Sequence, residues 1–382
     1  MIRLRRSLFS IKVSLIALLS LTIVLNITTR PTSSSAPDHT TTDVSLLRSI
    51  VRRIFGSGSL SRGLSVGGAK IRVALSGCGS SLMLALNAVK SILISTNGNS
   101  RISVFFFTEK RNHQYVRRRY QYFSQSAAWK GNLFLHVLAP TFPGMNTSAD
   151  KRRWMAMWKP CASQRLFLPD ILASEDSIIY VDADIVFLGA VEDLWRQFEE
   201  MNETQAIAMA NEHEIGMESE AYYNRHSKLP FFVPPLGVNS GVLLMNLTRL
   251  RSSNFTWEII RSYTKYQQKL NFHDQDLLNI YLYEHPENFY RLNCSWNYRM
   301  SHCINDTNNC HSAGTDGVRL LHGNRNAFTT RTMAEFRFIG DSISQVDLSL
   351  VKDDARNYLR NTVASTLNAT SCGSLLVKGL SS

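Results

Sequence analysis

The sequence predicts an α/β protein with a largely parallel central sheet. From Ile71 onward, short apolar segments alternate with longer segments of helical periodicity, a pattern typical of parallel strands joined by crossover helices. The chain has 382 residues, of which 44% are hydrophobic and 19% are charged, and this composition excludes disordered, fibrous and disulfide-knot proteins. A domain of about 280 residues beginning at Ile71 is long enough for one sheet with helices on both faces and an insertion.

Seven segments are expected to form strands, because they are short and apolar. They are 71–76, 102–108, 133–138, 177–181, 206–210, 241–246 and 318–321. Six segments between them have the apolar spacing of helices. They are 82–95, 111–124, 161–172, 191–202, 248–270 and 274–284. The chain has no internal repeat, so a repeat architecture is excluded.

An uncharged stretch, 13–29, follows four basic residues within the first twelve. As a helix it would reach ~26 Å at ~1.5 Å per residue, close to the ~27 Å hydrocarbon thickness of early secretory membranes. Cytoplasmic ends of membrane helices collect Lys and Arg, so the pattern predicts a single-pass type II signal anchor behind a cytoplasmic tail at 1–12. A cleaved signal peptide is the alternative, although no good cleavage site follows at once.

The rest of the chain is expected in the secretory lumen, with the protein in the Golgi or endoplasmic reticulum membrane. Residues 30–69 are rich in Ser, Thr, Pro and Gly and predict a luminal stem. The α/β domain is expected at 70–345, followed by a C-terminal extension at 346–382.

Sequons and cysteines agree with a luminal location. The chain has eight Asn-x-Ser/Thr sequons and six cysteines, an even number that allows up to three disulfides. We expect a local bridge between Cys303 and Cys310, because they flank a polar loop. A zinc site is disfavoured, because the sequence has no Cys-x-x-Cys pair.

The formal net charge is +12, from 42 Lys and Arg against 30 Asp and Glu. Such an excess would suit nucleic acid, an anionic membrane surface or an acidic small substrate. Part of it lies beside the predicted anchor, and the remainder is spread in short groups such as Arg117, Arg118 and Arg119. We interpret these groups as solvated helix faces. A luminal domain also makes nucleic acid an unexpected partner.

Two carboxylates end one of the predicted strands, in Ser177-Ile-Ile-Tyr-Val-Asp182-Ala-Asp184. If the segment stays extended, its period of two points Asp182 and Asp184 the same way, and one divalent cation can bind both. Asp-x-Asp alone is common in turns. At the end of a buried strand it is a stronger signal, because burying two unpaired carboxylates is costly.

A histidine ends another predicted strand, in Val318-Arg-Leu-Leu-His322-Gly-Asn-Arg325. A lone histidine is more often structural than a ligand. Beside a carboxylate pair, His322 becomes the natural third ligand. An imidazole among oxygen ligands suits manganese better than magnesium, whose preference for oxygen is stricter.

A third polar cluster begins a predicted helix, in Asn271-Phe-His-Asp274-Gln275-Asp276-Leu-Leu-Asn. Helix capping by His273 or Asp274 is the structural interpretation. Capping does not require Gln275 and Asp276 as well. The cluster has the donors and acceptors needed to hold sugar hydroxyls.

Several motifs together resemble glycosyltransferase family 8, the GT-A enzymes that include glycogenin, and in particular the animal glucoside xylosyltransferases, over roughly residues 70–340. The motifs are Trp158-Lys-Pro-Cys-Ala-Ser-Gln-Arg-Leu-Phe-Leu-Pro169, Val238-Asn-Ser-Gly-Val-Leu-Leu-Met-Asn-Leu-Thr248, Asp274-Gln-Asp-Leu-Leu-Asn279, Trp296-Asn-Tyr-Arg299 and Leu321-His-Gly-Asn-Arg325. None of them is specific alone.

The resemblance implies a GT-A fold and a set of site residues. Asp182, Asp184 and His322 would bind manganese against the diphosphate of a UDP-sugar. The nucleotide-binding residues would be Ser76, Gly77, Cys78, Gly79 and Gly323, with Arg165 reaching the donor. Asn239, Asp274 and Gln275 would surround the transferred sugar, with Asp274 and Gln275 as the catalytic residues.

The resemblance also implies a retaining transferase that moves xylose from UDP-xylose, in an α-1,3 linkage, onto O-linked glucose of EGF-like repeats such as those of Notch. A metal ion would stabilise the charge that develops on the departing UDP. Gln275 is a poor nucleophile and no carboxylate pair commits the chain to double displacement, so we expect front-face attack assisted by the leaving phosphate. Transfer of another UDP-sugar, glucose or galactose, and a silent sugar-binding relative are the alternatives.

The sequence departs from the family pattern in places. His273 replaces the small residue expected before the Asp-Gln pair and would make the pocket smaller. Residues 80–82 and 326–328 also differ, which leaves donor and acceptor details open. Four aromatic residues, Trp154, Trp158, Trp296 and Tyr298, offer a stacking surface for an acceptor, although core packing is expected for at least half of them.

Overall fold

The computed structural model describes residues 70–124, 132–157, 161–214, 216–217, 221–229, 231–330, 333–350 and 352–381. The predicted cytoplasmic tail, signal anchor and stem lie outside the described residues. Within the described ranges, no helix combines the length and the apolar character needed to cross a membrane.

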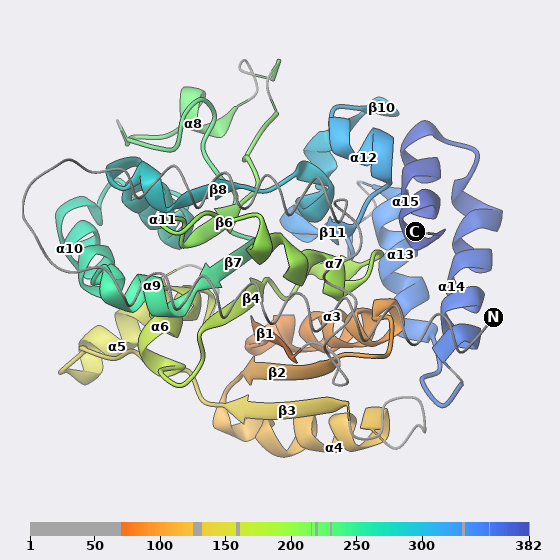
Figure 1. Cartoon of the computed structure of the whole chain (residues 1–382), viewed down its shortest axis with the longest axis horizontal. Helices are drawn as coiled ribbons and strands as arrows, with labels where there is room; N and C mark the ends of the chain where they lie inside the picture. The colour runs from red at the N-terminus through yellow and green to blue at the C-terminus, as the bar shows by residue number, and fades with distance from the viewer. Residues whose placement is uncertain are drawn as a thin grey trace, which may run out of the picture. The chain divides into compact units, whose positions relative to one another are not determined.

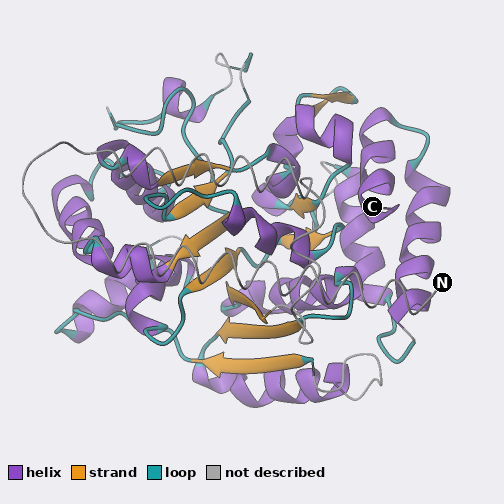
Figure 2. Cartoon of the chain, in the orientation of Figure 1, coloured by secondary structure: helices purple, strands orange, loops and turns teal. Residues whose placement is uncertain are grey.

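A seven-stranded sheet forms the centre of the described unit (Figures 1 and 2), in the order β3-β2-β1-β4-β7-β6-β8. The strands are β1 (Lys70–Ser76), β2 (Arg101–Phe107), β3 (Leu133–Leu138), β4 (Ser177–Val181), β6 (Ile207–Met209), β7 (Val242–Asn246) and β8 (Phe289–Arg291). β7 runs antiparallel to both of its neighbours, and the other neighbouring pairs are parallel. The mostly parallel sheet predicted from the sequence is confirmed.

Two short antiparallel pairs lie outside this sheet. β5 (Ile185–Phe187) pairs with β11 (Leu320–His322), and β9 (Cys303–Ile304) pairs with β10 (Thr307–Asn308). The strand predicted at 318–321 therefore exists but does not join the central sheet. β5 and β8 were not predicted, because three residues are too few to show a period.

Helices cover both faces of the sheet. They are α3 (Leu82–Ser95), α4 (His113–Ser124), α5 (Ser148–Met155), α6 (Leu168–Ile171), α7 (Val191–Arg196), α8 (Tyr222–Arg225), α9 (Leu247–Ser252), α10 (Phe255–Tyr266), α11 (His273–Glu284), α12 (His311–Asp316), α13 (Ala334–Gln345), α14 (Lys352–Leu367) and α15 (Ser371–Ser381). The single helix predicted at 248–270 is two helices. Asn246 caps α9 with its side chain, and Asn254, in the left-handed region with φ of 54°, separates α9 from α10.

The sheet divides the core into two clusters because side chains alternate along its strands. In β4, Ile179 and Val181 pack into the cluster that contains residues of α3, α13, α14 and α15. Ile178 and Tyr180 point to the opposite face and pack with residues of α9, α10 and α11. These two sets of helices lie on opposite sides of the view in Figure 1. The described part of segment 346–382 thus contributes buried side chains to the same core as the sheet.

Three disulfides use all six cysteines, and they pair Cys78 with Cys161, Cys294 with Cys310, and Cys303 with Cys372. The predicted bridge between Cys303 and Cys310 is wrong. Cys303 begins the β9–β10 hairpin, whereas Cys310 lies beyond it and precedes α12. Cys303 therefore pairs with Cys372 of the C-terminal segment instead. This last bridge joins α15 to the sequence that follows β8.

Candidate active site

A cavity of about 300 Å³ opens at the carboxyl ends of β1 and β4. Open α/β sheets bind ligands at this edge. Eight of the predicted site residues line the cavity: Ser76, Arg165, Asp182, Asp184, Asn239, Asp274, Gln275 and His322. Gly77, Cys78, Gly79 and Gly323 do not line it and belong to turns beside it.

Asp182 and Asp184 reach the cavity from a turn between β4 and β5. Residues 182–184 are not extended, as the sequence argument assumed, because the chain turns at Ala183 and Asp184. The pairing of β5 with β11 places His322 opposite Ile185. Gly323 N–H donates a hydrogen bond of 2.7 Å to the Asp184 carbonyl. Turn and pairing together bring the ligand atoms of Asp182, Asp184 and His322 within 4.8 Å of one another. We call these three residues the carboxylate end of the cavity.

The carboxylate end fits a divalent cation. His322 Nε2 lies 3.8 Å from Asp182 Oδ2 and 3.6 Å from Asp184 Oδ1, beyond ordinary hydrogen-bond length. This spacing leaves room for an ion among the three atoms. Gly241 makes room for the imidazole, because a Cβ there would lie 2.2 Å from His322 Cε1. Carboxylates and a neutral imidazole are ordinary ligands of divalent metals.

The charge around Asp182 also favours a cation. Burial raises the pKa of the Asp182 carboxyl; Arg165 opposes this shift, and the nearby Asp184 adds to it. An ion bound between the two carboxylates would offset both burial and their mutual repulsion. The pair is therefore more favourably ionised with a metal than without one.

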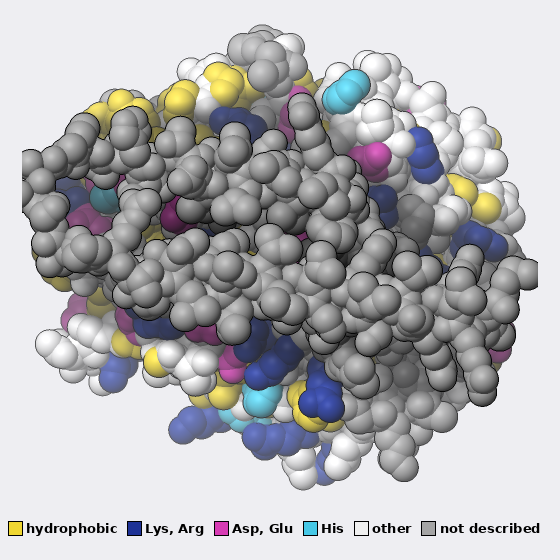
Figure 3. All heavy atoms as spheres, in the orientation of Figure 1, with side chains coloured by type: hydrophobic (Ala, Val, Ile, Leu, Met, Phe, Trp, Pro, Cys, Tyr) yellow, Lys and Arg dark blue, Asp and Glu magenta, His cyan; other side chains and the backbone are white. Residues whose placement is uncertain are grey.

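The cavity carries more acids than bases, although the chain is basic. Four carboxylates line it, from Asp182, Asp184, Glu212 and Asp274, against the guanidinium groups of Arg165 and Arg325. A diphosphate would be repelled by this excess unless a cation accompanied it. Basic side chains gather elsewhere, along the lower edge of the face shown in Figure 3, over β3 and α4, where Arg117–Arg119 are exposed.

Arg165 connects two parts of the site. It is 3% exposed, and its Nη2 and Nε lie 2.6 Å from Asp182 Oδ1 and 2.9 Å from Asp274 Oδ2. Burial alone would lower the pKa of the guanidinium, but Asp182 and Asp274 outweigh burial and raise it. Its plane also lies over the Tyr180 ring, 4.7 Å from the centroid. Arg165 therefore fixes both aspartates and stays charged.

A second group, Asn239, Gln275 and Glu212, forms what we call the amide end of the cavity. Glu212 Oε2 accepts hydrogen bonds from Asn239 Nδ2 at 2.7 Å, Gln275 Nε2 at 3.1 Å and Arg299 Nη1 at 3.0 Å. Arg299 is completely buried behind the site. Glu212 lines the cavity, and none of its hydrogen bonds within the described residues uses Oε1. This oxygen can accept a hydrogen bond from a ligand.

Asp276 is not part of the cavity, contrary to the expectation that it helps to hold sugar hydroxyls. It is completely buried and accepts hydrogen bonds from Tyr223 O–H at 3.0 Å and Phe272 N–H at 2.7 Å. Burial raises the pKa of Asp276 to about 6. Asp276 lies in the first turn of α11, and helical geometry turns its side chain away from those of its neighbours Asp274 and Gln275.

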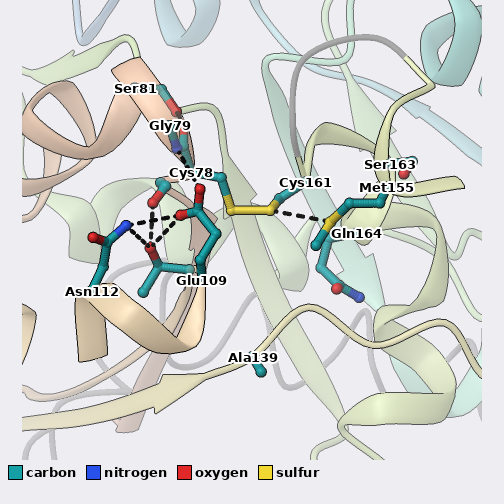
Figure 4. Close-up of a disulfide and its surroundings, with 12 residues drawn as sticks. Cys78, Gly79, Ser81, Glu109, Asn112, Ala139, Met155, Cys161, Ser163 and Gln164 are labelled. Carbon is teal, nitrogen blue, oxygen red and sulfur yellow. Dashed lines mark hydrogen bonds between the residues drawn. A yellow bond between two sulfur atoms is a disulfide. The ribbon is translucent and has the colours of Figure 1, made fainter. Parts of the chain in front are cut away.

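The turn after β1 is held by contacts with residues outside the cavity. Gly77 has no room for a side chain, since a Cβ would lie 2.6 Å from Ala85 Cβ, and Gly79 N–H donates to Glu109 Oε1 at 3.0 Å. Figure 4 shows the disulfide from Cys78 to Cys161, directly before the 3₁₀ helix Ala162–Phe167 that carries Arg165. The disulfide therefore ties the turn after β1 to the segment that positions Arg165.

The described residues of the predicted aromatic surface do not line the cavity. Trp154, Trp296 and Tyr298 are buried in the core, and Trp158 lies outside the described residues. The Phe and Tyr side chains that line the cavity, among the described residues, are instead Tyr180 and Phe272, and Phe272 stacks on Tyr222 with ring centroids 3.6 Å apart.

His273 does not line the cavity, so the idea that it narrows the pocket is wrong. Its backbone is in the left-handed region, with φ of 47°. Glycine adopts this conformation most easily, which explains why the family pattern has a small residue there.

Sequence reasoning missed Glu212, Asn297 and Arg299. Glu212 follows β6 at the same sheet edge as Asp182 follows β4, so the rule applied to one strand would have found it on the other. Arg299 and Asn297 belong to a motif whose aromatic residues drew attention instead. Their burial gave no signal in the sequence.

Comparison with known proteins identifies the family. Residues 74–326 match "Glycosyl transferase family 8". The chain is 38% identical over 285 residues to glucoside xylosyltransferase 2 of Mus musculus, an alignment that covers 72% of this chain and 61% of that protein. It is also 38% identical over 307 residues to glucoside xylosyltransferase 1 of Mus musculus, with 76% and 71% covered. The first of these relatives is therefore matched over less than two thirds of its length.

Solved structures share the fold. The galactosyltransferase LgtC, in complex with donor and acceptor sugar analogues, superposes with a TM-score of 0.51 at 14% identity, covering 76% of this chain and 96% of that one. The glycosyltransferase GlyE of Streptococcus pneumoniae TIGR4 also gives a TM-score of 0.51, at 16% identity, covering 75% and 63%. The chain thus has a GT-A-like α/β fold.

Proposed function

Because the chain belongs to glycosyltransferase family 8, we propose that it is a retaining xylosyltransferase that moves xylose from UDP-xylose onto O-linked glucose of EGF-like repeat proteins, in an α-1,3 linkage. The observation that carries this proposal is that one cavity contains both a triad that can bind a metal and an amide end that can hold a sugar. The relatives of the chain are named glucoside xylosyltransferases, which supports xylose as the sugar.

At the carboxylate end, Asp182, Asp184 and His322 would hold Mn²⁺ beside the donor diphosphate. The ion would supply a Lewis acid for the negative charge that develops as UDP departs. Arg165 favours the ionised form of Asp182 and orients its carboxylate, through the 2.6 Å contact.

At the amide end, the protein would orient the transferred sugar. Glu212 Oε1 accepts a hydrogen bond from a sugar hydroxyl, while Arg299 compensates its charge. Asp274 is engaged by Arg165 and Gln275 by Glu212, Asn239 and Ser240, so both side chains are held in place before substrate binds. An amide and a guanidinium-paired carboxylate are weak nucleophiles. This favours front-face attack by the acceptor hydroxyl, with the leaving phosphate as base.

We further propose a luminal location, in the Golgi or endoplasmic reticulum, behind the single-pass type II anchor at 13–29. Three disulfides and no free cysteine among the six support an oxidising compartment. N-terminal sequencing of the mature protein tests the anchor, since a start near residue 30 would show cleavage instead.

The decisive experiment is transfer itself. The full chain in detergent is incubated with Mn²⁺, a glucosylated EGF-like repeat and either UDP-xylose, UDP-glucose or UDP-galactose, and the product is weighed. We expect a gain of one pentose, and loss of that gain when the metal is chelated. A hexose gain would replace xylose as the donor sugar, and absence of transfer from every donor would favour a silent relative.

A further inference from the structure

One buried segment lies behind both ends of the cavity. It consists of the 3₁₀ helices Cys294–Asn297 and Met300–His302, and it carries Asn297 and Arg299, both with no exposed surface. The disulfides Cys294–Cys310 and Cys303–Cys372 attach it at either side. Arg299 reaches the amide end through Glu212. Asn297 reaches the carboxylate end through His322.

Backbone groups fix the direction of the amide at Asn239. Gly241 N–H donates to Asn239 Oδ1 at 3.0 Å, so the oxygen of this amide is identified by a group that can only donate. The nitrogen, Nδ2, must then be the atom that faces Glu212 at 2.7 Å. The same logic applies to Gln275, whose Oε1 accepts from Ser240 N–H at 3.0 Å. Its Nε2 therefore donates to Glu212.

The direction at Asn239 determines that of Asn297. Asn239 Oδ1 lies 2.9 Å from Asn297, and an oxygen can only accept there, so the Asn297 atom is the donor Nδ2. Asn297 Oδ1 then faces His322 Nδ1 at 2.9 Å. An amide oxygen requires a donor, so Nδ1 carries the proton. In the neutral ring this leaves the lone pair on Nε2, the nitrogen nearest to Asp182 and Asp184.

We propose that Asn297 is a positioning residue that holds His322 in the metal-binding tautomer and, through its other side-chain atom, orients Asn239 at the amide end. It touches neither donor nor acceptor. Ligand histidines in metal sites commonly donate their second N–H to a fixed acceptor, and loss of that acceptor costs 10- to 100-fold in metal affinity. This inference rests on the proposed function only in requiring a metal at the carboxylate end.

The test is calorimetric titration of Mn²⁺ into the full chain in detergent, with UDP present and no sugar transferred. Asn297→Ala removes both hydrogen bonds, and its Mn²⁺ affinity is expected to fall 10- to 100-fold. The matched control is Asn288→Ala. Asn288 is also a buried asparagine, donating to Tyr281 O–H at 2.8 Å outside the cavity, and its loss is expected to leave the affinity unchanged. An unchanged affinity in a folded Asn297→Ala variant would overturn the proposal.

A second variant separates the two hydrogen bonds and remains informative should Asn297→Ala not fold. Asn297→Asp keeps an acceptor for His322 but offers Asn239 Oδ1 an oxygen instead of a donor. We expect Mn²⁺ affinity within a few-fold of the native protein, with kcat for transfer reduced at least 10-fold. Native kcat, or a loss of affinity as large as in Asn297→Ala, would each contradict the proposal. Failure of the native protein itself to bind Mn²⁺ with UDP would refute the proposed function instead.

Discussion

Asp182, at the carboxylate end of the cavity, shares the guanidinium of Arg165 with Asp274, whereas Glu212, at the amide end, pairs with Arg299. Another buried carboxylate, Asp276, accepts hydrogen bonds from Tyr223 and Phe272 but forms no ion pair within the described residues, and burial raises its pKa to about 6. The difference lies in the cations supplied by the protein. Where the protein supplies too few cations, an external cation would stabilise the carboxylates. Where cations and carboxylates match in number, the carboxylate can bind neutral groups. Where no cation pairs with the carboxylate, its pKa is raised.

The largest expected effect comes from removing charge at the carboxylate end. Asp184→Asn should lower kcat on the order of a thousand-fold, because the leaving diphosphate loses metal stabilisation worth several kcal/mol. Steady-state transfer assays with UDP-xylose measure it. Asp341→Asn, an exposed position on α13, is the control and should retain full activity. Undiminished transfer by Asp184→Asn would exclude the metal mechanism.

Breaking the ion pair at the amide end should cost stability. Arg299→Met leaves Glu212 buried without its guanidinium, and the free energy of unfolding should fall by about 3–5 kcal/mol. Chemical denaturation measures this loss. The double variant Arg299→Met with Glu212→Gln should recover most of it, because no uncompensated charge remains. If the double variant is as unstable as the single one, the loss is due to packing rather than charge.

The unpaired carboxyl should make stability depend on pH. The pKa of Asp276 is higher in the folded protein, about 6, than the ordinary value of ~3.9 in an unfolded chain. The folded state therefore binds more protons between these values. Its contribution to stability is present below pH ~4 and is lost as the pH rises to ~6, a change of up to ~3 kcal/mol.

The variant Asp276→Asn tests this dependence. Its unfolding free energy, compared with that of the native protein from pH 4 to pH 7, should lack the Asp276 contribution. Parallel curves for the two proteins would mean that Tyr223 and Phe272 compensate the charge as well as a guanidinium does.

The smallest effect concerns the turn beside the amide end. His273→Gly should stabilise the protein by up to about 1 kcal/mol, because glycine adopts the left-handed backbone at no steric cost. Thermal unfolding measures the gain. Asn254→Gly, at φ of 54° between α9 and α10, should give a similar or smaller gain. Since His273 does not line the cavity, the choice of donor sugar should be unchanged, and a switch of donor would show that His273 contacts the sugar.

The sequence by itself determined most strands of the sheet and one end of the site. Short apolar segments located six of the seven strands of the sheet, and the rule that ligands bind at strand ends singled out Asp182, Asp184 and His322, which the structure brings together. Both depend on patterns within a few residues, which local backbone geometry imposes. The even number of cysteines likewise allowed up to three disulfides, and the structure has three.

Only the tertiary structure decided which polar groups meet across long separations. Arg299 and Glu212 are 87 residues apart, and Cys303 pairs with Cys372 at a separation of 69 instead of with the nearby Cys310. The periodicity of the sequence does not predict such contacts, because they join elements that are far apart along the chain. For the same reason Asp276, in the same motif as Asp274, turns away from the cavity, while Glu212 turns into it. The function of a buried charged group depends on the groups that it contacts, and tertiary packing determines these contacts.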